Sequence, residues 1–410
     1  MTLLNNAKSI TVSIYLLFFS IQSTSAADSF TAYLFAYFTG NSKTQEAIRF
    51  ALSNDAHNFK ALNNNNPVIS SEKISSTGGV RDPHILRGEN DDYYMVATDM
   101  VSANGWASNR GLVMLRSTNL IDWTSSAVNI PQTFPAYSAA DRVWAPQVIY
   151  DKTVGKYMVY FAMRLGPNVT DKIYYAFADS TFTHFESTPK LLYSYNSNAA
   201  IDADIICKDS TYYLFFKTEG SGNGIKSATS RNLTEGYILY DKYLQATTAA
   251  VEGSCVFPLI DSDTFVLMYD VYTSGKYEFA VSTDLRNFKK DPLPISFDFT
   301  PRHGTVIPIT EKEKKNLLAK WDPARAMTKS SIWNQSAGVR LHGTTLELIL
   351  NNRETSGSIS LVDISGRDVL RQTIQGKVTR ISMSSAPAGL FHVMLNTGRG
   401  NRSCTRIIVK

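Results

Sequence analysis

Short runs of apolar and aromatic residues recur through the first 310 residues, and each is about as long as one β-strand. Tyr and Phe dominate these runs, and both residue types favour strands over helices. Polar and turn-forming residues separate one run from the next. The clearest runs are 33–38, 93–97, 157–161, 212–216 and 265–269. This pattern predicts an all-β protein.

A sequence motif follows these runs at intervals: a small residue, then Asp or Asn, then an aromatic residue. Its copies span 53–59, 117–123, 179–185, 230–237 and 282–288, and the fourth copy is degraded. The intervals between their terminal aromatics are 64, 62, 52 and 51 residues. Repetition of one strand-turn-strand unit at such a period is typical of radial repeat architectures.

The period suits a four-stranded propeller blade, so we expect a five-bladed β-propeller over residues 28–310. A sandwich gives no reason for a fixed period, and a coil of a β-helix is far shorter. In the middle units an extra strand precedes the Tyr-rich run, at 83–86, 146–150 and 203–206. The first unit lacks this strand, whereas 304–309 has no unit to follow. We therefore predict that the last strand completes the first blade.

The residues that open the inner strands of a propeller converge at one mouth of its channel. Aligned with one another, these residues are Asp82, Trp144, Asp202, Glu252 and His303. An isolated Asp in this chain would most simply be a turn or capping residue, but three carboxylates in one register argue against that interpretation. Like charges in a concave site push one pKa upward, and a protonated and an ionised carboxyl together perform glycoside hydrolysis.

Other residues near these five bear on the candidate site. The indole of Trp144 offers a flat face on which a sugar ring can stack. Asp204, two residues beyond Asp202, is the main rival for its role. Asp99 and Glu219, at the ends of second strands, are expected to be structural.

Composition and charge narrow the class of protein. With 43% hydrophobic and 19% charged residues the chain is globular rather than disordered. Its formal net charge of +5 does not by itself indicate nucleic acid. The charge is uneven: residues 28–310 hold 24 basic and 29 acidic residues, whereas 338–410 hold 10 and 4. Only the terminal part could therefore account for affinity to an anionic surface.

The two ends of the chain suggest export. Residues 1–27 combine Lys8, a mostly apolar run over 10–21 and small residues at 23–27, which predicts a cleaved signal peptide. A membrane anchor is the alternative, but the run is shorter than the roughly 20 residues that span a bilayer. We expect no other membrane segment, and a secreted or cell-surface location.

The cysteines are too few and too scattered for a disulfide framework or a CxxC metal site. We expect Cys207, Cys255 and Cys404 to be packed thiols, with a Cys207–Cys255 bridge as the alternative.

Beyond residue 310 the pattern changes. Residues 311–337 carry a charged run and no period of two, so we expect a linker or a belt packed on the propeller. Alternation returns over 338–410 in short strands, which suits a small β-sandwich module. The segments 361–367 and 387–393 resemble C-terminal secretion-sorting modules of bacterial exported enzymes, which would make the export machinery a partner. A carbohydrate-binding sandwich is the alternative, but Phe391 is the single aromatic of this part.

The segments around the five aligned residues resemble the signature segments of glycoside hydrolase family 43, in family order and over about residues 30 to 310. The segments are Arg81-Asp82-Pro83, Trp144-Ala145-Pro146-Gln147-Val148, Ile201-Asp202, Val251-Glu252-Gly253-Ser254 and Pro301-Arg302-His303-Gly304-Thr305-Val306. The sequence departs from the family at Ala203, often Pro, and at Ser254-Cys255, more usually Pro-Ser. Both departures bear on the third carboxylate.

The resemblance implies a five-bladed propeller that hydrolyses arabinose- and xylose-containing polysaccharides with inversion. It implies that Asp82 is the general base, Glu252 the general acid, and Asp202 the third carboxylate, which orients the acid and raises its pKa. It also implies that Arg302 binds substrate and that His303 lies near the channel centre. In some family members this histidine helps to hold a calcium ion, so a structural calcium is an option, while no cofactor is required.

The sequence thus predicts an exported glycosidase acting on plant cell-wall polysaccharides, with α-L-arabinofuranosidase activity favoured over β-xylosidase. A non-catalytic carbohydrate-binding propeller is the competing class. A sialidase, suggested by the repeated turns, is disfavoured because the turns come five rather than six times. No nucleic acid partner is expected.

Overall fold

The computed structural model describes residues 29–219, 223–323 and, with short gaps, 337–409. The predicted signal peptide, residues 1–27, lies outside the described residues. The described part is mostly β, as the sequence predicted, with a few short helices. No helix among the described residues is both long and apolar enough to cross a membrane.

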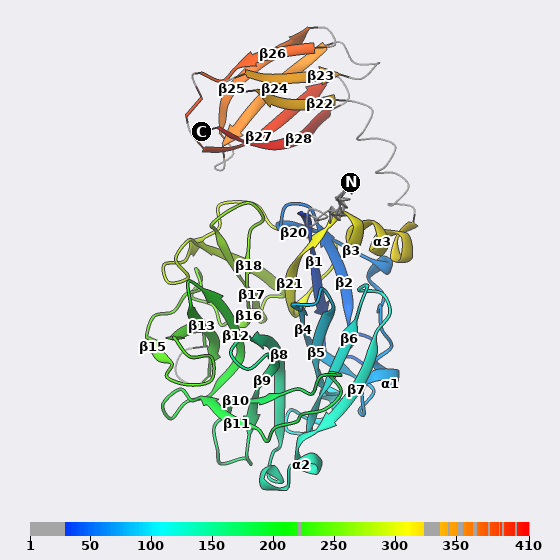
Figure 1. Cartoon of the computed structure of the whole chain (residues 1–410), viewed down its shortest axis with the longest axis vertical. Coiled ribbons are helices and arrows are strands. Elements are labelled where there is room, and N and C mark those ends of the chain that lie inside the picture. The colour runs from blue at the N-terminus through cyan, green and yellow to red at the C-terminus, as the bar shows by residue number, and fades with distance from the viewer. Residues whose placement is uncertain are drawn as a thin grey trace, which may run out of the picture.

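Five sheets form between residues 30 and 310 (Figure 1). The first contains β1 (Phe30–Phe38), β2 (Arg49–Ser53), β3 (Asn58–Ala61), β20 (Ser296–Phe297) and β21 (Arg302–Thr310). The second contains β4 (Val80–Arg87), β5 (Tyr93–Asp99), β6 (Gly111–Ser117) and β7 (Thr124–Asn129). The third contains β8 (Arg142–Asp151), β9 (Lys156–Arg164), β10 (Lys172–Phe177) and β11 (Lys190–Tyr193).

The fourth sheet contains β12 (Ala200–Lys208), β13 (Thr211–Thr218), β14 (Ile225–Ser230) and β15 (Ile238–Tyr240). The fifth contains β16 (Glu252–Pro258), β17 (Phe265–Val271), β18 (Lys276–Ser282) and β19 (Lys289–Lys290). Short helices lie in the connections: η1 (Asn63–Asn65), α1 (Ser71–Ile74), η2 (Ser102–Asn104), α2 (Ile130–Thr133) and η3 (Pro135–Tyr137).

The first strands of four sheets and β21 lie at the centre of this arrangement. Strand β4 contacts β8, β8 contacts β12, β12 contacts β16, β16 contacts β21, and β21 contacts β4. In Figure 1 these strands lie in the middle of the group, and outer strands such as β7, β11 and β15 lie at its rim. The opening residues of these central strands therefore face a common space.

The last strand completes the first sheet, as predicted. Strand β21 pairs antiparallel with β1 over most of its length, for example Val306 with Phe35. A second connection follows from the segment before it, because β20 pairs parallel with β3. The two ends of the 30–310 region are thus joined through backbone hydrogen bonds on both sides of the first sheet.

A buried histidine strengthens this junction. The Nε2 of His57 lies 2.8 Å from Oδ2 of Asp291, and its Nδ1 lies 2.7 Å from the carbonyl oxygen of Asp55. Both ring nitrogens face acceptors, so the ring is satisfied when both carry protons. Burial lowers the pKa of His57, but its hydrogen bonds to Asp291 and to the Asp55 carbonyl outweigh burial and leave the pKa raised.

The junction should therefore weaken at alkaline pH. A raised folded-state pKa gives stability that is fully present below the unfolded value of about 6.5 and is lost as pH rises through the folded value. We expect Asp291→Asn to lower the free energy of unfolding at pH 6 by about 1.5–3 kcal/mol, the worth of a hydrogen bond to a charged group. The variant should also lose part of the alkaline decline seen by urea unfolding between pH 6 and 9. An equal decline in both proteins would contradict this assignment.

The repeated motif forms the turn between the third and the outer strand of each sheet. The Asp or Asn side chain accepts hydrogen bonds from backbone N–H groups that follow it. Asp55 accepts from His57 and Asn58, and Asp284 accepts from Arg286 and Asn287. These turns are structural and lie away from the central strands, which explains their repetition without a role in chemistry.

The charged run after residue 310 forms a helix, α3 (Glu311–Trp321), where the sequence predicted no regular element. A capping box starts it: Thr310 Oγ1 accepts from the Glu313 N–H, and Glu313 accepts from the Thr310 N–H. Glu313 also pairs with Arg87 of β4 at 2.7 Å. Leu317 and Leu318 are buried in the core that includes the first two sheets, so the helix is packed rather than free. Residues 324–336 of the predicted linker lie outside the described residues.

The C-terminal residues form two further sheets. One contains β22 (Ala337–His342), β23 (Thr345–Leu350) and β26 (Val378–Ser382). The other contains β24 (Ser356–Asp363), β25 (Asp368–Gln375), β27 (Gly389–Thr397) and β28 (Gly400–Val409). Leu346 and Ile381 of the first sheet share a core with Ile359 and Phe391 of the second, so the two sheets pack face to face.

Two of the cysteines can be placed. Cys255 is buried, as expected of a packed thiol, and Cys207 is exposed, which corrects the expectation for that residue. Both are free thiols, so the alternative of a Cys207–Cys255 bridge is wrong. Cys207 follows the buried stretch of β12, where the alternation of the strand turns its side chain outward. The state of Cys404 lies outside the described side chains.

Candidate active site

Bulges in the central strands direct the candidate residues. The pairing register breaks between Arg81 and His84 in β4, and at the same point in β8, β12 and β16. One residue of each break has a left-handed backbone, with φ values of 51° at Asp82, 43° at Ala145, 51° at Asp202 and 65° at Gly253. A bulge leaves its extra residue unpaired and turns its side chain, which is how functional residues are often presented.

The bulges also correct the register inferred from sequence. Trp144 and Glu252 each precede the left-handed residue, so they align with Arg81 rather than with Asp82. His303 lies in the break between Arg302 and Gly304, and aligns with Asp82 and Asp202. The sequence alignment was therefore displaced by one residue at Trp144 and Glu252. A bulge position cannot be read from strand periodicity, because the extra residue breaks that period.

All six predicted site residues nonetheless line one cavity of about 490 Å³. These are Asp82, Trp144, Asp202, Glu252, Arg302 and His303. Further lining residues that the sequence did not indicate as binding groups include Arg81, Trp106, Arg142, Lys217, Glu219 and Tyr272.

Two carboxylates of the cavity flank His303. Nδ1 of His303 lies 3.5 Å from Oδ1 of Asp82 and 4.0 Å from Oδ2 of Asp202. Asp82 also accepts a hydrogen bond from Thr98 Oγ1 at 2.8 Å, and Asp202 accepts one from the Gly253 N–H at 3.0 Å. All three side chains are largely buried, so their mutual charges are poorly screened.

The two carboxyls differ in pKa. Burial raises the pKa of Asp82, but the hydrogen bond and charge of His303, together with Arg81 and Thr98, outweigh it and hold the pKa below its usual range. Burial raises the pKa of Asp202 to about 6, and the positive charge of His303 offsets this only in part. Burial lowers the pKa of His303, but the charges of Asp202 and Asp82 raise it to about 9.

Gly253 is required at its position for two reasons. Its φ of 65° is strained for any other residue, and a Cβ there would lie 2.8 Å from the His303 ring. Ser254, one of the departures from the family pattern, donates its hydroxyl to the carbonyl oxygen of Asp202 at 2.8 Å. The departure therefore supports the Asp202 backbone. The other departure, Ala203, is buried.

Glu252 lies between two cations. Its Oε1 accepts from Nη2 of Arg302 at 2.6 Å, and its Oε2 accepts from Nζ of Lys217 at 3.2 Å. Arg302 also donates to Asp270 at 2.6 Å, and Lys217 also donates to Glu219 at 3.3 Å. The charges of the neighbouring carboxylates raise the pKa of both Arg302 and Lys217 against the effect of burial, so both remain charged.

The rival and neighbouring carboxylates can now be placed. Asp204 is buried, accepts from the Val256 N–H and does not line the cavity, so it is not a rival of Asp202. Asp99 accepts from the N–H groups of Ser76 and Thr77, which confirms its structural role. Glu219, expected to be structural, lines the cavity instead.

Trp144 is partly covered by a charged side chain. The guanidinium carbon of Arg142 lies 4.3 Å from its ring centroid, and Arg142 in turn donates to Asp171 at 3.0 Å. The ring therefore contacts a guanidinium as well as lining the cavity. Arg142, Lys217 and Asp270 lie within β8, β13 and β17, and no sequence motif distinguishes them.

The residues around His303 do not fit direct coordination of calcium. Calcium takes oxygen ligands, whereas His303 presents a nitrogen atom, Nδ1, to Asp82 and Asp202. Among the described residues no three His, Cys, Asp or Glu side chains are grouped to hold a metal. Calcium binding by this protein stays a prediction from the family resemblance.

Comparison with known proteins identifies the family. A family model described as a probable glycosyl hydrolase domain, related to glycoside hydrolase family 43, matches residues 28–315. An α-L-arabinofuranosidase of Bifidobacterium longum is 33% identical over a match of 127 residues, and the match covers 27% of this chain and 11% of that protein. The chain thus covers about a tenth of the length of this curated relative.

Two solved structures are also similar. An endo-1,4-β-xylanase of Bacteroides thetaiotaomicron is 14% identical, with a TM-score of 0.47, and the match covers 67% of this chain and 93% of that one. The family 43 protein BlXynB of Bacillus licheniformis is 13% identical, with a TM-score of 0.47, over 93% of this chain and 82% of that one. The family model spans more than half of the chain, so the chain belongs to the family 43-related glycosyl hydrolases.

Proposed function

We propose that this protein is a glycosidase that hydrolyses arabinose- and xylose-containing plant polysaccharides with inversion at the anomeric carbon. We also propose that α-L-arabinofuranosidase is its main activity. The observation that carries the mechanism is the convergence of three carboxylates in one cavity with different partners. The Asp82 pKa is lowered and the Asp202 pKa is raised to about 6. A lowered pKa keeps Asp82 ionised, as a general base requires. The acid of this proposal is Glu252, and Asp202 acts through its neighbours.

The proposed roles follow from this arrangement. Asp82, ionised beside His303, takes a proton from the attacking water. Glu252, held by Arg302 and Lys217, donates a proton to the leaving oxygen. Asp202 shares His303 with Asp82 and holds the N–H of Gly253, so it acts by orienting the residue next to Glu252. The proton count balances because the base gains one proton as the acid loses one.

The choice of arabinofuranosidase is supported by the relative from Bifidobacterium longum, which bears that name and matches part of this chain. We also propose that the five sheets are the five blades of a propeller, whose central strands contact one another in order. We further propose that residues 1–27 are a signal peptide that directs secretion, and that the 338–410 module is recognised by the export machinery. A plant cell-wall polysaccharide is then the substrate met outside the cell.

A substrate panel with product analysis tests this proposal. The full chain is incubated with nitrophenyl α-L-arabinofuranoside, nitrophenyl β-xyloside, arabinan and arabinoxylan, and the first anomer released is recorded by proton NMR. We expect the arabinofuranoside to give the highest kcat/KM and the product to form with inverted configuration. A higher kcat/KM for the xyloside would show that the main activity is that of a β-xylosidase. A product with retained configuration would overturn the mechanism. Binding without turnover would indicate a carbohydrate-binding propeller.

A further inference from the structure

Glu252, the proposed general acid, contacts two cations in this structure. Nη2 of Arg302 lies 2.6 Å from its Oε1, and Nζ of Lys217 lies 3.2 Å from its Oε2. A positive charge this close favours the ionised form of a carboxyl, whereas a general acid must carry a proton before it can give one to the leaving oxygen. At least one of the two cations therefore needs another acceptor while Glu252 is protonated.

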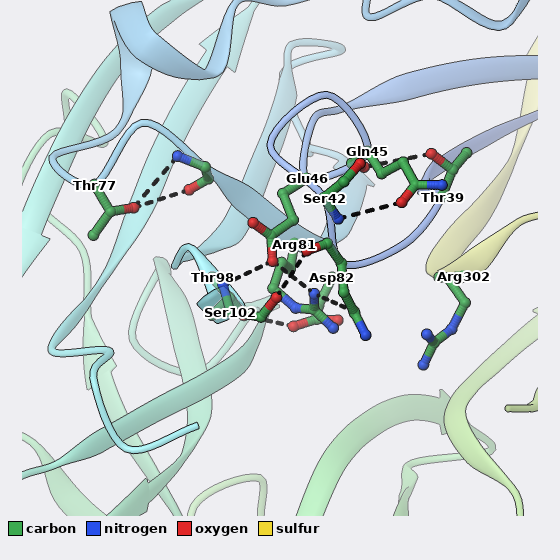
Figure 2. A network of polar contacts seen from close by, with 12 residues as sticks. Thr39, Ser42, Gln45, Glu46, Thr77, Arg81, Asp82, Thr98, Ser102 and Arg302 are labelled. Carbon is green, nitrogen blue, oxygen red and sulfur yellow. Dashed lines mark hydrogen bonds and ion pairs between the residues drawn. The ribbon is translucent and has the colours of Figure 1, made fainter. Parts of the chain in front are cut away.

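Arg302 is tied to a second carboxylate that cannot be left alone. Its Nε donates to Oδ2 of Asp270 at 2.6 Å, and the side chain of Asp270 is fully buried. Moving the guanidinium away would leave a buried carboxyl without its counter-ion, which is costly. Figure 2 shows Arg302 apart from the network of Glu46, Arg81 and Asp82. Arg302 is thus the fixed cation of the acid, and the cation next to the base belongs to a separate network.

Lys217, by contrast, has a second acceptor in the same cavity. Its Nζ lies 3.3 Å from Oε1 of Glu219, nearly the same distance as from Glu252, and 4.9 Å from the ring centroid of Tyr272. The Lys217 side chain is buried, but the carboxylates on either side of it are partly exposed. The flexible stem of a lysine lets its ammonium shift between two such acceptors. The ammonium can therefore turn from Glu252 to Glu219 and remain paired.

Other titratable groups face Glu252 from the neighbouring strands. They are Asp202 of β12, Asp270 of β17, Tyr277 of β18, and Arg302 and His303 of β21. Burial raises the pKa of Tyr277 well above its usual value, so its hydroxyl stays neutral. The charges of the others act on Glu252 in both positions of the Lys217 ammonium. The position of Lys217 therefore adds a difference to a constant background.

We infer that Lys217 and Glu219 are positioning residues that set the pH range over which Glu252 can act as the acid. While Glu252 is protonated, Glu219 holds the Lys217 ammonium. As Glu252 gives its proton to the leaving oxygen, Lys217 turns back and stabilises the new carboxylate, and it keeps its own protons throughout. Both roles rest on the proposed function, because they take Glu252 as the acid.

Carbon-13 NMR of the full chain with labelled glutamate side chains tests these roles, because the carboxyl resonance of Glu252 reports its protonation directly. The resonance is assigned by its loss in Glu252→Gln. We expect Lys217→Met to raise the pH midpoint of Glu252 by about 1–2 units, since a contacting cation is lost. Lys217→Arg keeps the charge and should bring the midpoint back toward that of the wild type. Glu219→Gln should lower the midpoint by about 0.5–1 unit, since a nearby like charge and the second acceptor are both lost.

The pH dependence of activity should follow the same directions. On arabinan, whose sugar leaving group needs the proton, the alkaline limb of kcat/KM reports ionisation of the acid. We expect this limb to move to higher pH in Lys217→Met and to lower pH in Glu219→Gln. A merely structural contribution of either residue would lower kcat and leave the limb in place.

Lys226 provides the matched control. It is a buried lysine of the adjacent strand β14 that also pairs with a carboxylate, Asp241, but it does not line the cavity. Lys226→Met should leave the Glu252 midpoint unchanged. An unchanged midpoint in Lys217→Met or in Glu219→Gln, or a shift in the same direction in both, would overturn the assigned roles. If Lys217→Met does not fold, Glu219→Gln decides alone, because its partly exposed side chain is not needed for packing.

The proposed function can fail separately from these roles. If the midpoints move as expected but the wild-type chain hydrolyses none of the sugars, Lys217 and Glu219 do control the proton of Glu252 and the proposed function falls. If hydrolysis with inversion occurs but the midpoints do not move, the proposed function stands and the roles of Lys217 and Glu219 fall.

Discussion

Glu252→Gln and Asp82→Asn are each expected to lower kcat by about 10²–10⁴, the usual worth of general acid or base assistance. Each change removes one titratable group and keeps the size of the side chain. Asp82→Asn leaves no carboxylate to take the proton of water, and Glu252→Gln leaves no acid for the leaving group. Steady-state kinetics on a natural glycan such as arabinan, whose sugar leaving group needs the proton, measures the loss, and circular dichroism checks that the fold is retained.

Glu219→Gln is the sharpest control for this prediction. Glu219 lines the same cavity and pairs with the same Lys217 as Glu252, but it has no assigned proton to transfer. We expect its loss to lower kcat by less than about tenfold, since general acid–base assistance is retained. Turnover near that of the wild type in Glu252→Gln or Asp82→Asn would refute the assignment of these roles. An equal loss in all three variants would show that charge in the cavity, and not proton transfer, is what matters.

Arg302→Met is expected to lower the free energy of unfolding by about 3–5 kcal/mol, the cost of removing one partner of a buried ion pair. Arg302 bridges Asp270, whose side chain is fully buried, and Glu252. Without the guanidinium, the carboxyl of Asp270 is left buried without its counter-ion. Even with Arg302 present, burial raises the pKa of Asp270 to about 6. Urea unfolding at neutral pH, followed by tryptophan fluorescence, measures the change.

The double variant Arg302→Met with Asp270→Asn separates the causes of this loss. It removes the uncompensated charge together with its partner, so we expect it to regain a large part of the lost stability. Activity should not return in the double variant, because Glu252 still lacks the donor on Oε1. Stability of Arg302→Met equal to that of the wild type would show that the pair contributes nothing to folding.

The parts of the fold that the sequence predicted are those encoded by neighbouring residues. The turns at Asp55 and Asp284 follow from side-chain hydrogen bonds to the backbone within a few positions. The closing strand could be found because 304–309 lacked a partner and the first unit lacked a strand. The helix over residues 311–321 was not predicted, although Thr310 and Glu313 match the sequence pattern of a capping box. The charged residues of this segment dominate its pattern, so the two leucines that pack the helix on the core, Leu317 and Leu318, were not recognised.

The sequence predicted only those site residues that lie within recognisable sequence segments. Asp82, Asp202 and Glu252 each open a central strand, and they share one cavity. The sequence did not predict that Lys217, Asp270 and Trp106 belong to the site. Each lies in a strand or loop without a recognisable motif, and each contacts a partner that is distant in sequence. Lys217 meets Glu252, Asp270 meets Arg302, and Trp106 meets Arg81.

The sequence alone determined that the chain is built from repeated strands, that its last strand returns to its first, and that Asp82, Asp202 and Glu252 belong to one site. These properties depend on side-chain alternation and on turns, which are local. Only the tertiary structure decided the register of Trp144 and Glu252, the exposure of Cys207 and the cations that hold Glu252. A left-handed bulge shifts every later side chain by one position, and a buried charge takes its partner from whichever strand packs against it.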